Sequence, residues 1–108
     1  MKLENYTPHQ VNYYAPCGAI IELPSVGVAR VDSEAQNIGS FGLNDSTILI
    51  KLQSQKLGEI TGLPKKRDNV YIIVSAMVKS ASDRSDLLSP ADYIRDNGRV
   101  IGCMAFNK

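Results

Sequence analysis

His9 is the single histidine of the chain and lies in the segment Thr7-Pro8-His9. A lone imidazole can act as a general acid or base, or hold the phosphate of a ligand. The structural alternative is that Pro8 fixes a turn and His9 only hydrogen-bonds the backbone nearby. Tyr14, further along the same segment, offers a ring that can stack on a planar ligand. His9 and Tyr14 are therefore candidate ligand-binding residues, with both interpretations of His9 left open.

The densest group of charged residues lies in the C-terminal part of the chain. Guanidinium groups hold phosphate or carboxylate through a planar two-pronged fork, so clustered arginines suit a small anionic ligand. The candidate ligand-binding residues of this group are Arg84, Asp86, Arg95 and Arg99. The alternative is an intramolecular network in which Asp83 or Asp86 pairs with Arg84. Asp96 would then pair with Arg99, and the arginines would bind only their own chain.

Sequence motifs of catalysis are absent. The chain contains no phosphate-binding loop, no dinucleotide fingerprint, no zinc-protease motif and no nucleophile elbow. Ser75, at an expected strand-to-helix turn, lacks the flanking glycines of a nucleophile and is interpreted as a helix cap. Paired carboxylates for acid–base chemistry need a shared or apolar pocket, and no pattern marks one. We therefore predict no catalytic residue and favour a binding protein over an enzyme.

Two cysteines, Cys17 and Cys103, lie near opposite ends of the chain. With one histidine they cannot complete a four-ligand zinc site, so neither a metal nor a cofactor is predicted. A disulfide would form in an oxidising compartment. Two buried thiols in a reduced cytoplasm are the preferred interpretation.

The composition is that of one small globular domain spanning residues 1–108. Hydrophobic residues are 44% of the 108, charged residues are 21%, and the formal net charge is +1. Area scaling gives roughly 5,900 Å² of folded surface against roughly 17,000 Å² for the unfolded chain, so about 65% is buried. This balance excludes a disordered tail and lacks the basic excess of proteins that bind nucleic acid polymers. No apolar run reaches the roughly 18 residues of a membrane span, and the N-terminus lacks the apolar stretch of a secretory signal.

The N-terminal third is expected to be β-structure. Residues 11–14 and 19–23 surround a Pro/Gly turn and predict a hairpin, which residues 28–31 continue as a meander. The polar, glycine-rich segment 32–45 is expected to be a loop, either functional or only a surface excursion. Phe41 is the one aromatic residue of that segment and its candidate anchor.

The rest of the chain predicts further strands and one short helix. Residues 70–74 are the most apolar run and predict a central strand. Ser75 suits the N-cap of a helix over 75–81, a polar loop follows at 82–90, and Asp96-Asn97-Gly98 predicts a tight hairpin turn. The other predicted strands are 47–52, 56–61, 93–95 and 99–106. We expect a mainly antiparallel β domain, a small barrel or curled sheet, with one short α-helix.

Four short blocks of the sequence resemble a group of small proteins encoded by bacteriophages, prophages and some bacteria. The blocks are residues 6–11 (YTPHQV), 74–78 (VSAMV), 83–86 (DRSD) and 94–103 (IRDNGRVIGC). The likeness covers both ends and the C-terminal half, and leaves residues 32–60 unmatched. It implies a phage-associated protein in the cytoplasm of a bacterial host and assigns no activity.

Small phage proteins without catalytic machinery often act by binding, and some sequester the nucleotide signals of bacterial immune systems. Such proteins are similar to this chain in size and role only. We therefore predict a homo-oligomer that binds an anionic, nucleotide-like ligand without converting it. Its pocket is expected between protomers, because one small core has little room for a cavity. The alternatives are a small hydrolase of a nucleotide-like metabolite, with His9 or an aspartate as base, and a structural or interaction module without a ligand.

Overall fold

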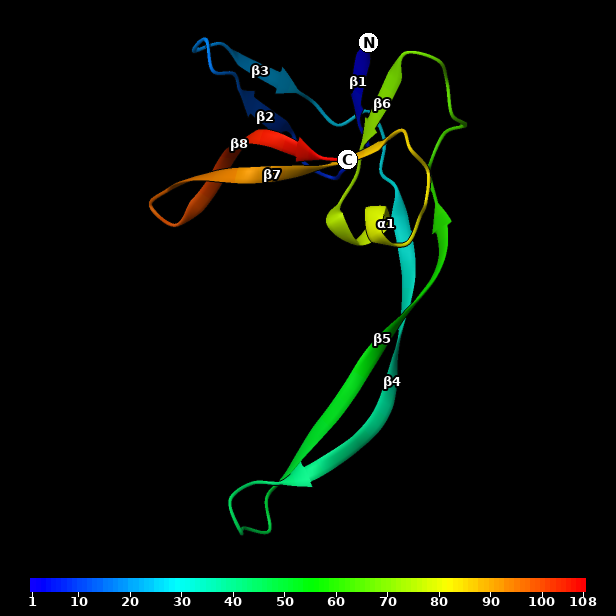
Figure 1. Cartoon of the computed structure of the whole chain (residues 1–108), viewed down its shortest axis with the longest axis vertical. Helices are drawn as coiled ribbons and strands as arrows, with labels where there is room; N and C mark the ends of the chain where they lie inside the picture. Colours follow the sequence, from blue (N-terminus) through cyan, green and yellow to red (C-terminus); the bar gives the residue numbers. More distant parts are fainter.

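The computed structural model describes all 108 residues and contains eight strands and one short helix (Figure 1). In chain order the elements are β1 (Lys2–Asn5), β2 (Val11–Tyr14), β3 (Ile20–Leu23), β4 (Arg30–Gly42), β5 (Leu49–Thr61), β6 (Val70–Ile73), α1 (Ala76–Ser80), β7 (Leu87–Asp96) and β8 (Arg99–Asn107). The predicted mainly β fold with one short helix is confirmed. No helix of the structure has the length and apolar character that crossing a membrane requires.

Six of the strands form one curled sheet in the order β1-β6-β7-β8-β2-β3. The hairpins β2–β3 and β7–β8 pair antiparallel across short turns, whereas β1–β6, β6–β7 and β2–β8 pair parallel through longer connections. Asn5 at the end of β1 bridges Ser25 just after β3, and the amide of Val26 donates to the carbonyl of Asn5 at 2.9 Å. The two edges of the sheet therefore meet, and the sheet is nearly closed like a small barrel.

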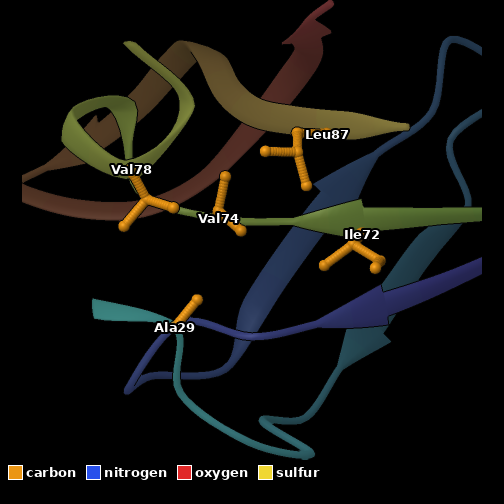
Figure 2. Close-up of a cluster of buried hydrophobic side chains, with 5 residues drawn as sticks. All are labelled: Ala29, Ile72, Val74, Val78 and Leu87. Carbon is orange, nitrogen blue, oxygen red and sulfur yellow. The ribbon is translucent and has the colours of Figure 1, made fainter. Parts of the chain in front are cut away.

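The hydrophobic core lies between β6, α1 and the start of β7 (Figure 2). Its five side chains are Ala29, Ile72, Val74, Val78 and Leu87. β6 is an interior, buried strand, as its apolar run predicts. The predicted helix is confirmed with its cap, because Oγ of Ser75 accepts the amide of Val78 at 3.2 Å. This cap directs the side chain of Val78 onto the sheet.

β4 and β5 leave the six-stranded body as a long two-stranded ribbon, which we call the arm (Figure 1). Each strand has 13 residues, and the two pair antiparallel along their length. The predicted loop over 32–45 is therefore wrong, and the predicted strands 47–52 and 56–61 belong to one strand. Both faces of an isolated ribbon meet water, so its sequence lacks the apolar alternation by which half-buried strands are recognised. Pairing still satisfies the backbone hydrogen bonds of this polar segment.

Other boundaries are set by contacts that are distant in sequence. β7 begins at Leu87, inside the predicted loop 82–90, because its first two residues pair with β6 and are buried. β1 is a strand that the sequence did not predict, and its only sheet partner is β6. The predicted hairpin of β2 and β3 is confirmed. The tight turn before β8 is also confirmed, since Asn97 and Gly98 have φ angles of 50° and 78°.

Candidate ligand-binding site

A pocket of about 330 Å³ opens between the start of β2 and the β7–β8 hairpin. It is lined by His9, Gln10, Val11, Pro90, Tyr93, Val100, Ile101, Gly102 and Cys103. These segments are neighbours because β8 pairs with both β2 and β7. The volume lies within the range of small-molecule sites, about 300 to 1,000 Å³. Residues of a single protomer line this pocket, and the expected position between protomers stays a prediction.

Asn5 holds the segment that carries His9. Its side chain is buried, and Nδ2 donates to the carbonyl oxygens of His9 and Leu23, both at 2.8 Å. Oδ1 of Asn5 accepts the amide of Thr7 at 2.9 Å. The backbone of His9 is therefore fixed against the end of β3, while the residue lines the pocket. Sequence reasoning did not identify this role of Asn5, because its partners lie on separate segments of the chain.

Tyr93 lines the pocket, and Arg95 lies two residues further along β7, outside the lining. The pairing of β7 with β8 shifts register between Ile94 and Arg95, so the partners on β8 locate the two residues better than strand alternation does. Tyr93 pairs with Cys103 and Arg95 pairs with Val100, and both partners line the pocket. Tyr93 is 53% exposed, which leaves its ring open to a ligand. Sequence reasoning missed Tyr93 as a site residue, although its spacing from Arg95 within a predicted strand was a usable signal.

Like Arg95, the predicted site residues Arg99 and Tyr14 do not line the pocket. Arg99 pairs with Asp96, which neighbours Arg95 on the strand and therefore belongs to the opposite face. The predicted ion pair between Arg99 and Asp96 does not form, since both ion pairs of the structure lie elsewhere. The ring of Tyr14 packs against Gly102 and fills the space where a side chain at that position would begin.

Arg84 and Asp86 form an ion pair at the start of β7. The carboxylate of Asp86, 4% exposed, accepts from Nε and Nη2 of Arg84 at 3.0 and 2.7 Å. Nη1 of Arg84 donates to the carbonyl of Pro64 at 2.9 Å. Hydrogen bonding to Arg84 holds the pKa of Asp86 below its ordinary value. The intramolecular alternative therefore holds for this pair, and roughly 30 Å of extended strand separates Asp86 from Arg95.

The two cysteines are both free and differ in exposure. Cys17 is exposed in the turn between β2 and β3, so the predicted pair of buried thiols is wrong for this residue. Cys103 is buried on β8, and burial raises the pKa of its thiol. Cys103 therefore lines the pocket as a protonated thiol, which is a poor nucleophile.

We expect a chromogenic disulfide reagent to modify Cys17 rapidly in the folded protein and Cys103 only after opening or denaturation. The rate at Cys103 should be lower by about 100-fold or more, because its sulfur is both buried and protonated. Stopped-flow absorbance on Cys17→Ser and Cys103→Ser variants assigns the two rates. Equally fast reaction of both thiols in the native protein would contradict the buried position of Cys103.

No family model, curated protein or solved structure matches the chain. The structure also contains no group of three or more His, Cys, Asp or Glu side chains that could hold a metal ion.

Proposed function

We propose that the protein is a homo-oligomeric binding protein for a small, planar, anionic ligand of nucleotide type. The ligand is held in the pocket that His9 lines, which we call the His9 pocket, and is not converted. One observation carries the proposal: His9 and Tyr93 line the same pocket, and Arg95 pairs with a third lining residue, Val100. An aromatic ring suits a nucleobase, a guanidinium suits a phosphate, and an imidazole can hydrogen-bond either group.

The distribution of charge supports a small ligand over a polymer. The formal net charge is only +1, so the chain has no general positive field to attract nucleic acid. An anion must instead be held by a local cation, and Arg95 is the predicted arginine that pairs with a lining residue of the pocket, Val100. The resemblance to phage-encoded proteins is the reason to expect action in the cytoplasm of an infected bacterium; sequestration of a nucleotide signal there is part of the proposal.

The pocket residues support binding more than hydrolysis. Neither ion pair of the chain includes His9, so no carboxylate orients its imidazole as in a catalytic triad. The thiol of Cys103 has a raised pKa and stays protonated near neutral pH. The buried carboxylate of Asp86 is held by Arg84. A hydrolase would therefore depend on His9 acting as base without an orienting partner.

Calorimetric titration with linear and cyclic mono- and dinucleotides tests the proposal. We expect one class to bind, and we expect Arg95→Ala and Tyr93→Ala to raise its Kd by roughly 10- to 100-fold, the worth of a charged hydrogen bond or a stacking contact. Arg99→Ala is the matched control, since it removes the same charge from the same hairpin on the opposite face. Its Kd should stay close to that of the wild type.

Heating the complex and analysing the released ligand separates binding from catalysis. A ligand recovered intact supports sequestration, whereas an altered ligand identifies a hydrolase. The proposal fails if no nucleotide binds, or if Arg95→Ala and Arg99→Ala weaken binding equally.

A second candidate function, an interaction module without a ligand, is favoured by the arm. Its outer half presents several large apolar side chains to solvent. Such exposure on a projecting element is typical of protein–protein contact.

A further inference from the structure

The outer end of the arm carries an apolar face that its own chain leaves exposed. Directly opposite residues of an antiparallel pair point to the same side. Phe41 lies opposite Ile50, and Leu52 is two residues further along β5. We call Phe41, Ile50 and Leu52 the tip face; Phe41 is 48% exposed and Leu52 41% exposed. The other side of the ribbon at this level has Ser40 opposite Lys51, and a single large apolar side chain, Leu49, opposite Gly42.

The body of the same chain is too far away to cover the tip face. Figure 1 shows the arm projecting from the body near α1, with the β4–β5 turn at the opposite end of the molecule from the six-stranded sheet. The molecule measures 56 × 36 × 19 Å, and the paired strands of the arm hold the tip outward. Any cover for the tip face must come from another molecule.

The ribbon itself also requires a partner on physical grounds. A two-stranded hairpin that packs against nothing is only marginally stable in water. Nearly all residues of β4 and most of β5 are exposed, and only the root of the arm lies close to the hydrophobic core. The pairing of two 13-residue strands therefore needs a further surface to stabilise it.

The exposed area is large enough for a permanent interface. The accessible surface is 7639 Å², whereas a compact monomer of this mass exposes roughly 5,900 Å². The excess of roughly 1,700 Å² exceeds the roughly 800 Å² that each partner buries in a standard interface. An excess of this size on each protomer lies instead in the range of the area that a subunit buries in an obligate homodimer. Only 12 of 108 residues are buried, so the isolated protomer has a small core.

We infer that the arm docks through its tip face onto the body of a second copy of this chain, within a closed homo-oligomer. The body also carries exposed apolar side chains that lie outside the His9 pocket. They include Ile20, Ile21, Val26, Met77 and Met104. A second copy offers side chains of this kind to each arm, and reciprocal docking leaves no arm free.

Light scattering of the full chain after size exclusion tests this assembly. The measured mass of the wild type should be at least twice the 11.8 kDa of one chain. Phe41→Asp places a charge in the docked face and should raise the dissociation constant by about 30-fold or more, as loss of a central contact does. Leu52→Asp should act in the same way. Ser40→Asp adds the same charge to the adjacent residue on the opposite face and should leave the mass unchanged.

Two readouts keep the result interpretable. Slow thiol modification of Cys103 reports that the body of each variant is folded. Tyr93→Ala should keep the wild-type mass, so loss of ligand binding and loss of assembly are separate outcomes.

A wild type of 11.8 kDa at all concentrations overturns the inference. A folded Phe41→Asp variant that keeps the wild-type mass also overturns it. Loss of assembly in Ser40→Asp equal to that in Phe41→Asp would do the same.

Discussion

Replacing Arg84 with methionine should lower the free energy of unfolding by about 2 to 3 kcal/mol at pH 7. The substitution removes both hydrogen bonds to the carboxylate of Asp86, which is 4% exposed. It also removes the donor to the carbonyl of Pro64, which ties the connection between β5 and β6 to the start of β7. The carboxylate left behind is poorly solvated and has no partner for its charge. Partial exposure of Arg84 keeps the expected loss below that of a fully buried pair.

Urea denaturation at a series of pH values checks the electrostatic origin of this effect. Arg84 lowers the pKa of Asp86 in the folded state, so the pair stabilises the fold above the unfolded pKa of about 3.9. That stabilisation is lost as the pH falls through the lowered folded pKa. The difference between wild type and Arg84→Met should therefore be complete at neutral pH and shrink on acidification.

Two further variants serve as controls. Arg84→Met combined with Asp86→Leu should recover most of the lost stability, because apolar pairs often replace a buried ion pair at little cost. Arg67→Met removes the more exposed ion pair with Glu4 and should change stability little. Equal destabilisation by Arg84→Met and Arg67→Met would show that the ion pair of Arg84 contributes no more to the free energy of unfolding than the exposed pair does.

Gly62→Ala should lower the free energy of unfolding by about 3 kcal/mol or more. Gly62 follows β5 at the root of the arm and has a φ of 85°, in the left-handed region that disfavours a side chain. A Cβ at this position would also collide with the carbonyl oxygen of Val28. Because the colliding atom belongs to the backbone, no side-chain rotation relieves it. The strain would separate the two strands of the arm from the core residue Ala29.

Gly98→Ala isolates the steric part of this effect. Gly98 has a similar φ of 78°, but a Cβ there would meet no atom within 4 Å. Its substitution should cost only the conformational penalty, about 1 to 2 kcal/mol. Chemical denaturation of both variants gives the difference directly. Equal losses for the two glycines would mean that the arm root rearranges easily and that the carbonyl of Val28 is not fixed.

Several elements of the fold were predictable because their signals are local. Ser75 accepts a hydrogen bond from an amide only three residues away, and the turn at Asn97-Gly98 depends on backbone preferences of two adjacent residues. The boundaries of β1 and β7 were not predictable in this way. Both strands depend on pairing with β6, which is distant in sequence.

The candidate site was only partly predictable for the same reason. Residue type singled out His9 and Arg95; the structure places His9 in the pocket lining and Arg95 outside it, paired with the lining residue Val100. Residue type could not separate Arg95 from Arg99, because the strand register decides which of them pairs with a lining residue. The pocket also needs β8 between β2 and β7, an arrangement of strands that no local pattern specifies.

By itself the sequence determined the mainly β composition, the first hairpin, the capped helix and the tight turn before β8. Each of these depends on neighbouring residues, whose steric and hydrogen-bonding preferences act without the rest of the fold. Only the tertiary structure decided that Arg84 binds Asp86 while Arg95 pairs with the pocket residue Val100, since both outcomes depend on burial and register. It also decided that the polar segment 32–45 belongs to an arm, because a ribbon with both faces in water carries no apolar alternation.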